Sequence, residues 1–184
     1  MIKKISSLVY KACHNKSNFF GPTIWDNHVL PVVEDAKILA QKLGADRQVV
    51  EISAWLHDYA SIKNKSFYPE HHLHGARLAG VILKKMNYPE DKIDQVKKCI
   101  YSHRASKNIP RKSLEAKIVA CADAMAHFKN VDKLLYFAYV KRKMDPEEGK
   151  KWVLEKLKRS YVKLLTPAKK MLKKKIEAIK IVFS

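Results

Sequence analysis

The sequence predicts an all-α protein. Apolar residues recur at helical spacing along almost all of the 184 residues, and only five residues are glycine. Such spacing places apolar side chains on one face of each helix, where they can form a core. Apolar residues make up 47% of the chain, so its composition excludes a disordered protein. The length favours one domain with appended helices.

The first half of the chain has clear helix starts and stops. The first predicted helix is amphipathic, with an apolar face of Ile5, Leu8, Val9 and Ala12. A second helix spans about 26–43, with Pro31 near its first turn, and stops before Gly44. Asp46 is a good N-cap for a third helix, which ends near His57-Asp58.

The second half continues as helices separated by turn residues. Residues 60–69 (ASIKNKSFYP) are predicted as a loop. Helices then follow at about 70–87, 90–102, 112–128, 130–143 and 146–165, and Pro167 starts the last one. The predicted buried stripe of the helix at 146–165 is Trp152, Leu154, Leu157, Tyr161 and Leu164. That of the last helix is Ala168, Leu172, Ile176 and Ile179.

The chain is strongly basic, with a formal net charge of +19. Residues 141–184 hold 15 Lys and Arg against 5 Asp and Glu. Such a surface attracts anions such as nucleotides, nucleic acid or acidic lipid. The same pattern also fits a lysine-rich protein whose solvated helix faces bind nothing, and the sequence leaves both interpretations open.

The three cysteines are widely spaced and indicate buried thiols in a reducing compartment rather than a disulfide framework. The N-terminus lacks an adequate signal-peptide core, and no apolar run approaches the roughly 20 residues that span a bilayer. We therefore expect a cytoplasmic protein with no membrane partner.

Several polar residues interrupt apolar helices or end them. They are His28, His57, Asp58, His74, His103 and Asp123. A buried carboxylate or imidazole costs several kcal/mol unless it is paired or binds a metal. A divalent cation would satisfy several of these groups at once, and mixed imidazole and carboxylate ligands suit Mn, Fe, Zn, Co or Ni better than Ca or Mg.

The remaining histidines are expected to be less important. His71 and His72 are predicted as surface residues beside His74. His127 lies one turn after Asp123, and a satisfied polar side chain is the favoured interpretation over a metal ligand. His14 is expected to have no special role.

The ordered pattern His…His-Asp…His…His…Asp, with gaps of 29, 1, 16, 29 and 20 residues, is more specific than any member alone. Together with WDNHVLPVV, ISAWLHDYA and KIVACADAMAHF, it resembles the HD superfamily of metal-dependent phosphohydrolases over residues 20–130. The resemblance implies an HD-domain helical bundle. Residues 1–130 would then form the metal-binding domain, and residues 131–184 a basic C-terminal helical extension packed on it.

The resemblance also implies a ligand set. His28, His57, Asp58 and Asp123 match the mononuclear sites of the family. His74 and His103 resemble the extra pair of a binuclear subgroup, in which Asp58 would bridge two metals; this subgroup includes enzymes that cleave dinucleoside polyphosphates. One or two divalent metals per chain are therefore expected.

The implied reaction is attack on phosphorus by a hydroxide, because a metal lowers the pKa of bound water to about 7. His57 and Asp58 would form the catalytic centre. The cations nearest to the ligands in sequence, and hence the candidates for phosphate binding, are Lys63, Arg77, Arg104 and Lys107. The usual lysine position after His-Asp is displaced in this chain, and Lys63 or Lys65 would substitute for it.

The expected substrate is a nucleotide or a related phosphorylated small molecule, cleaved at a phosphomonoester or pyrophosphate bond. One alternative is a basic nucleic-acid-binding or regulatory protein with a non-catalytic HD domain. Another is a nuclease that acts on nucleic-acid ends. The sequence leaves an oligomeric state open.

Overall fold

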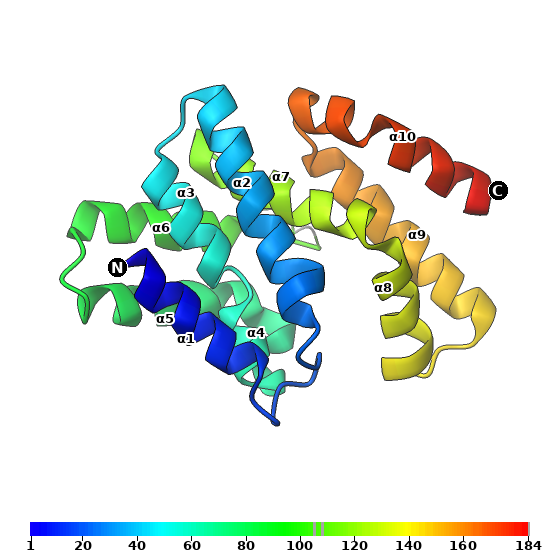
Figure 1. Ribbon diagram of the computed structural model, residues 1–184, viewed down its shortest axis with the longest axis horizontal. Helices are drawn as coiled ribbons and strands as arrows, with labels where there is room; N and C mark the ends of the chain where they lie inside the picture. The colour runs from blue at the N-terminus through cyan, green and yellow to red at the C-terminus, as the bar shows by residue number, and fades with distance from the viewer. Residues whose placement is uncertain (105, 108, 184) are drawn as a thin grey trace.

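The computed structural model describes residues 1–104, 106–107 and 109–183, and within these ranges it contains helices and connections but no strand (Figure 1). The predicted all-α class is confirmed. The α-helices are α1 (Ile2–Cys13), α2 (Leu30–Leu43), α3 (Arg47–Leu56), α4 (Tyr59–Lys63), α5 (His71–Lys84), α6 (Glu90–Ser102), α7 (Leu114–Lys129), α8 (Val131–Tyr136), α9 (Pro146–Lys163) and α10 (Thr166–Phe183). Among the described residues, no helix is both long and apolar enough to cross a membrane.

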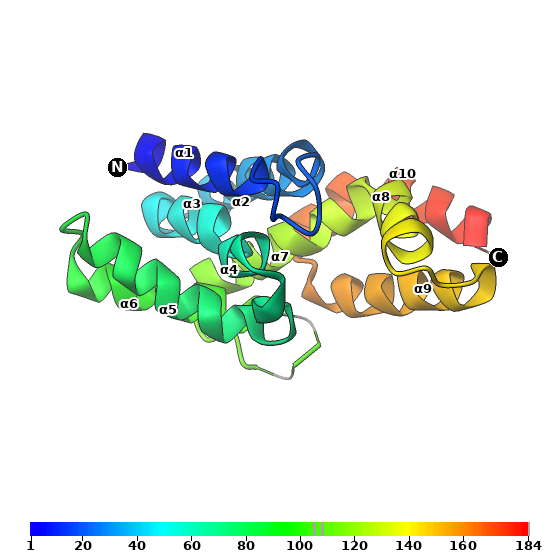
Figure 2. The same ribbon diagram turned by 90° about the horizontal axis from the view of Figure 1, so that it is seen from below.

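Helix α7 is the centre of the fold. It runs between α1–α6 on one side and α8–α10 on the other, and the chain termini lie at opposite ends of the molecule (Figures 1 and 2). Every residue from Ile118 to Phe128 is buried, and α7 contacts α2, α3, α6, α9 and α10. A helix that is apolar all round is a buried one. The polar Asp123 and His127 within it are therefore held inside the protein.

Local signals fix the ends of the helix that leads into the site. Gly44 ends α2 with a φ of 70°, in the left-handed region that glycine adopts without strain. Asp46 caps α3 by accepting hydrogen bonds from the backbone N–H groups of Gln48 and Val49. The other end of α3 leads directly into His57 and Asp58.

The start of α2 differs from a regular helix. The preceding turn, η1 (Trp25–Val29), is π-helical and carries His28. Pro31 has no N–H to donate to the carbonyl of Asn27, four residues earlier, and the side-chain amide of Asn130 donates to that oxygen over 2.6 Å instead. Single π-turns are frequent at functional sites.

The loop prediction for residues 60–69 is wrong. The structure has α4 at Tyr59–Lys63 and the 3₁₀ turn η2 (Lys65–Glu70). Tyr59, Ala60 and Ile62 are buried, so tertiary packing stabilises a helix too short to form alone. The helix predicted at 130–143 is likewise divided into α8 and the π-turn η3 (Phe137–Lys141).

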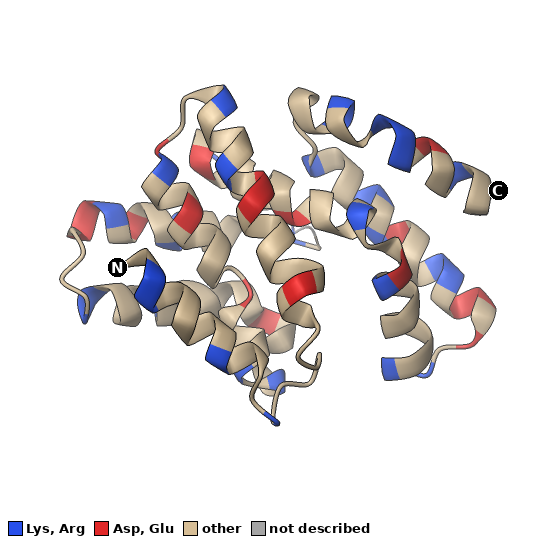
Figure 3. Ribbon diagram, viewed as in Figure 1, with Lys and Arg blue, Asp and Glu red and all other residues tan. Residues whose placement is uncertain are grey.

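The C-terminal helices pack on α7. Ala168, Leu172 and Ile179 of α10 are buried and Ile176 is partly buried, as predicted. In α9 the predicted stripe is partly wrong, because Tyr161 is 44% exposed while Ser160 and Lys163 are buried. Figure 3 shows Lys and Arg on α9 and α10 and also on the N-terminal helices.

Candidate metal centre

Imidazole and carboxylate groups from five separate segments, one of them α7, converge at one place in the fold. They are His28 in η1, His57 and Asp58 after α3, His71 at the start of α5, His103 after α6, and Asp123 and His127 in α7. Their ligating atoms form three overlapping groups that could each hold a metal ion: His28, His57 and Asp58; His28, Asp123 and His127; and Asp58, His71 and His103.

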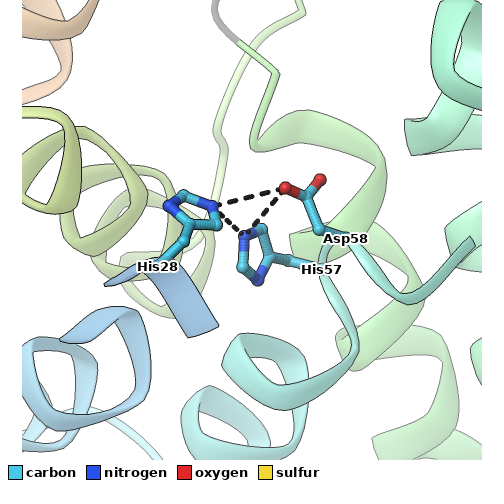
Figure 4. Close-up of side chains that lie close together, drawn as sticks. All are labelled: His28, His57 and Asp58. Carbon is cyan, nitrogen blue, oxygen red and sulfur yellow. Dashed lines mark hydrogen bonds and ion pairs between the residues drawn. The ribbon is translucent and has the colours of Figure 1, made fainter. Parts of the chain in front are cut away.

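The first group is drawn in Figure 4. Nε2 of His28 lies 3.1 Å from Nε2 of His57 and 3.3 Å from Oδ2 of Asp58. Nε2 of His57 is 3.5 Å from the same carboxylate oxygen. Three ligating atoms therefore face one point between the side chains.

The other oxygen of Asp58 faces the third group, which contains His71 and His103. Oδ1 lies 3.5 Å from Nε2 of His71 and 3.7 Å from Nε2 of His103. The two oxygens of one carboxylate thus point to two different pairs of imidazoles. This is the arrangement of a carboxylate that can bridge two metal ions.

Asp123 and His127 complete the centre on the α7 side. Oδ1 of Asp123 is 3.6 Å from Nε2 of His28 and 3.6 Å from Nε2 of His127. Nδ1 of His127 is 2.9 Å from the hydroxyl oxygen of Ser160, which comes from α9. Both α7 residues are buried.

Helix ends orient two of the rings. The last carbonyl groups of a helix lack intrahelical N–H partners. Nδ1 of His57 donates to the carbonyl of Ala54 over 2.8 Å, and Nδ1 of His103 donates to that of Ile100 over 2.5 Å. Each bond fixes the tautomer and turns Nε2 toward the centre, as carbonyl groups that accept from the far nitrogen of a ligating histidine do in metal sites.

The pair His71 and His103 shows that the residues fit a cation. Nδ1 of His71 also donates to a carbonyl, that of Tyr68, over 2.9 Å. With Nδ1 as the donor, the neutral form of each ring presents a lone pair at Nε2, and the two Nε2 atoms lie 3.2 Å apart. Burial lowers the pKa of His71, which disfavours a proton between the rings. A metal ion bound to both nitrogens would remove the repulsion.

The electrostatics of the other ligands agree with this donor set. Burial lowers the pKa of His57 to about 4, so the ring is neutral and free to ligate. Burial alone would raise the pKa of Asp58, but the adjacent His57, His103 and His28 outweigh it and hold that pKa well below its usual range. The pKa of Asp123 is also well below its usual range, because Lys163 and His127 outweigh burial.

Two cavities meet at the centre. One has a volume of about 230 Å³ and is polar, with Arg104, Lys156, Arg159 and Lys163 in its wall beside His71 and His103. The other, of about 160 Å³, reaches His28 and is lined by aromatic side chains. Both include Asp58, His127, Tyr68, Trp152 and Lys156.

The sequence model of the HD domain matches residues 25–127, more than half of the chain and the segment that contains every side chain of the cluster. The chain belongs to the HD domain family. This is a family of metal-dependent hydrolases, and the described part of the chain contains His and Asp clusters that could bind a divalent metal.

A solved structure is similar to this chain over most of its length. The crystal structure of a predicted HD superfamily hydrolase from an uncultured Thermotogales bacterium aligns with a TM-score of 0.60 and 25% sequence identity. The alignment covers 84% of this chain and 83% of that one, and therefore extends beyond the residues of the HD match. No curated protein matches the chain.

The cluster brings together most of the ligands that the sequence predicts for an HD site. His28, His57, Asp58, His103 and Asp123 are all in it. His74 is not. Its ring stacks on that of Phe67, with centroids 4.2 Å apart, and His71 faces Asp58 instead.

The surface prediction for His71 and His72 is therefore wrong. His71 is in the centre, and His72 is 3% exposed, with Nδ1 3.3 Å from an Arg104 nitrogen. His127, for which a satisfied polar side chain was favoured, also faces Asp123 and His28 within one of the possible metal groups.

Of the four cations predicted to bind phosphate, one lines a cavity at the centre and three do not. Arg104 lines the polar cavity. Lys63, Arg77 and Lys107 do not line either of the two cavities. Lys63 lies 6.0 Å from the ring centre of Tyr59, and Lys107 is 3.6 Å from a Glu70 oxygen.

Helix α9 contributes basic residues to the polar cavity that were not among the candidates predicted from the sequence. Lys156, Arg159 and Lys163 all line the polar cavity, together with Ser160. Their spacing of three, four and seven residues places them on one helix face. That spacing was the available signal, but only the packing of α9 on α7 shows that this face meets the metal centre.

Proposed function

We propose that the protein is a metal-dependent phosphohydrolase acting on a nucleotide or a related phosphorylated small molecule. The observation that carries this proposal is the opposition of two imidazole pairs across the two oxygens of Asp58, next to a cavity lined by cations. Such a donor set suits a transition metal, and such a cavity suits the oxygens of a phosphate group.

The proposed ligands are His28, His57, Asp58, Asp123 and His127 on one side, and Asp58, His71 and His103 on the other. This set would hold one or two divalent ions drawn from Mn, Fe, Zn, Co or Ni, and Asp58 would contribute an oxygen to each side. When bound, such a metal polarises the phosphoryl oxygens and lowers the pKa of a bound water to about 7.

The protein side chains have separate tasks in this proposal. Asp58 and His57 form the catalytic centre, where Asp58 contributes one oxygen to each side of the cluster and His57 presents its Nε2 as a ligand. Arg104, Lys156 and Arg159 would bind the phosphoryl oxygens in the polar cavity. Cations held in place before the substrate arrives stabilise charge that develops on phosphorus oxygens without further reorganisation.

The test combines metal analysis with a substrate screen. Bound metal per chain would be measured by elemental analysis for the wild type, Asp58→Ala and Asp94→Ala. Phosphate release would be screened over mononucleotides, nucleoside polyphosphates, sugar phosphates and oligonucleotides. Asp94 is half exposed, pairs with Lys97 and is outside both cavities, so its variant is the matched control.

We expect Asp58→Ala to lose metal and phosphate release together, while Asp94→Ala keeps both. A chain that binds no transition metal and releases no phosphate would overturn the proposal. Salt-sensitive binding of oligonucleotides without turnover would then favour the nucleic-acid-binding alternative. Turnover of oligonucleotides alone would identify a nuclease.

A further inference from the structure

The cavity of about 160 Å³ has an aromatic wall built from four separate segments. Phe20 lies before η1, Tyr68 in η2, Phe137 in η3 and Trp152 in α9. The ring of Phe20 stacks on that of Phe137 at 5.7 Å and lies 5.6 Å from that of Tyr68. The rings of Phe137 and Trp152 are 6.0 Å apart. The wall is thus a continuous set of ring contacts.

Polar side chains line the same cavity. Thr23, Asn27, Asn130 and Lys133 contribute a hydroxyl, two amides and an ammonium group. The Asn130 amide is held by its bond to the Asn27 carbonyl. A cavity for an aliphatic chain would need no such groups. Aromatic surface combined with a few placed polar groups is typical of small-molecule sites, and aromatic side chains stack well on the flat face of a nucleobase.

Trp152 connects this cavity to the polar one. It lines both, together with Asp58, His127 and Lys156. The guanidinium carbon of Arg142 lies 5.2 Å from the centre of the Trp152 ring, and Nζ of Lys156 lies 5.8 Å from it. These cations are within cation–π distance and hold the indole in place beside the metal centre.

Most of the aromatic wall is outside the segment that defines the family. The HD match covers residues 25–127, whereas Phe20 precedes it and Phe137 and Trp152 follow it. The metal ligands are therefore in the shared domain, while this cavity depends on residues specific to the flanking segments. Substrate selection is the function that most readily differs between members of one hydrolase family.

We propose that this cavity binds the nucleobase of the substrate, with Trp152 as a specificity-determining residue and the phosphate placed at the metal centre. The proposal rests on the proposed phosphohydrolase function and narrows its substrate class from phosphorylated small molecules to nucleotides. The ring occupies the aromatic cavity, and the phosphate reaches past Asp58 toward the cations of α9.

The kinetic test compares two phosphate esters that differ in the ring. The ratio of kcat/KM for a nucleoside monophosphate to that for ribose 5-phosphate would be measured for the wild type, Trp152→Ala and Tyr161→Ala. Stacking of a base on an aromatic side chain changes affinity by about 5- to 150-fold. We expect Trp152→Ala to lower the ratio within that range. Tyr161, an exposed aromatic residue of the same helix outside both cavities, is the control and should leave the ratio unchanged.

A binding test is independent of hydrolysis. Unphosphorylated adenosine, guanosine, cytidine and uridine would be titrated by calorimetry into the metal-free protein. We expect at least one to bind, and Trp152→Ala to weaken it. If Trp152→Ala fails to fold, Trp152→Leu and Phe137→Leu give the same comparison with smaller changes in volume.

The outcomes separate the two proposals. Nucleoside binding that depends on Trp152, without any phosphate release, would support the ring pocket and overturn the phosphohydrolase. Phosphate release with an equal preference for ribose 5-phosphate in the wild type and Trp152→Ala would support the hydrolase and overturn the ring pocket. Absence of nucleoside binding together with an unchanged ratio would also overturn the pocket.

Discussion

Nζ of Lys163 lies 2.5 Å from Oδ2 of Asp123, and both side chains are buried. The ion pair joins α9 to α7 at the edge of the metal centre, and Lys163 also donates to the carbonyl of His103 over 3.3 Å. One oxygen of Asp123 is thus occupied by an internal cation, while the other faces His28 and His127. Helix α9 is in this way part of the site.

Lys163→Met should destabilise the metal-free protein strongly. Removing one partner of a buried ion pair leaves an uncompensated charge and costs about 3–5 kcal/mol, which corresponds to a fall of roughly 6–20 °C in unfolding temperature. A metal bound at Asp123 would replace the lost cation. We therefore expect added metal to raise the unfolding temperature more in Lys163→Met than in the wild type, as measured by calorimetry.

Lys158→Met is the matched control, because Lys158 is an exposed residue of the same helix. Its unfolding temperature should stay near that of the wild type with and without metal. An equal rise on metal addition in the wild type and Lys163→Met would show that the ion pair and the metal site are not coupled.

His71 and His74 allow a direct comparison, because both belong to HHLHG. His71→Ala should lower the metal content per chain, because the metal proposed to bind His71 and His103 would lose a ligand. His71 faces both Asp58 and His103. His74→Ala should keep the full content, because His74 stacks on Phe67. Elemental analysis of both variants against the wild type is the measurement. Loss of metal in His74→Ala with retention in His71→Ala would contradict the observed geometry.

The sequence could predict His28, His57, Asp58 and Asp123 because each is tied to a recognisable helix end or apolar stretch. It could not choose His71 over His74. That choice depends on the end of η2, where the Tyr68 carbonyl orients the His71 ring, and this segment was predicted as a loop. His71 and His74 are three residues apart on one helix, yet His71 faces Asp58 and His74 stacks on Phe67.

The sequence could not predict that α9 lines the polar cavity, and the reason is different from that for His71. Its Lys156, Arg159 and Lys163 form a regular basic face, and such faces usually point to solvent. Only a contact between residues 40 apart in the chain, Asp123 and Lys163, places this face at the site. The periodicity of one sequence predicts that a segment is helical and which of its faces is basic. It does not predict which other helix that face contacts.

The cations of the polar cavity should determine phosphate affinity. Arg159→Gln should weaken the binding of inorganic phosphate to the metal-loaded protein severalfold, because Arg159 lines that cavity. Lys63→Gln should have little effect, since Lys63 is exposed beside Tyr59 and is outside both cavities. Calorimetric titration with phosphate measures both. A greater loss in Lys63→Gln would support the phosphate site expected from sequence proximity.

The cap of α3 gives a pH-dependent prediction away from the ligands. Oδ1 of Asp46 accepts from two backbone N–H groups, and Oδ2 lies 2.6 Å from Nζ of Lys92. The hydrogen bond from Lys92, and next that from the Val49 N–H, hold the pKa of Asp46 below its ordinary value of 3.8. A carboxyl whose pKa is lowered by folding stabilises the protein above its unfolded pKa and loses that contribution as the pH falls through the folded value.

Asp46→Ala should cost about 0.5–2 kcal/mol at neutral pH, the usual range for a lost N-cap. Asp46→Asn keeps a capping oxygen but not the charge, so it should cost less. The difference between the wild type and Asp46→Asn should be constant well above pH 3.8, shrink below that pH and disappear once the pH is below the lowered pKa of Asp46. Urea unfolding with a chelator present, at neutral and acidic pH, measures this. A difference that persists at the lowest pH would mean that Asp46 acts on α3 through its shape alone, and not through the charge it presents to Lys92 and the helix N-terminus.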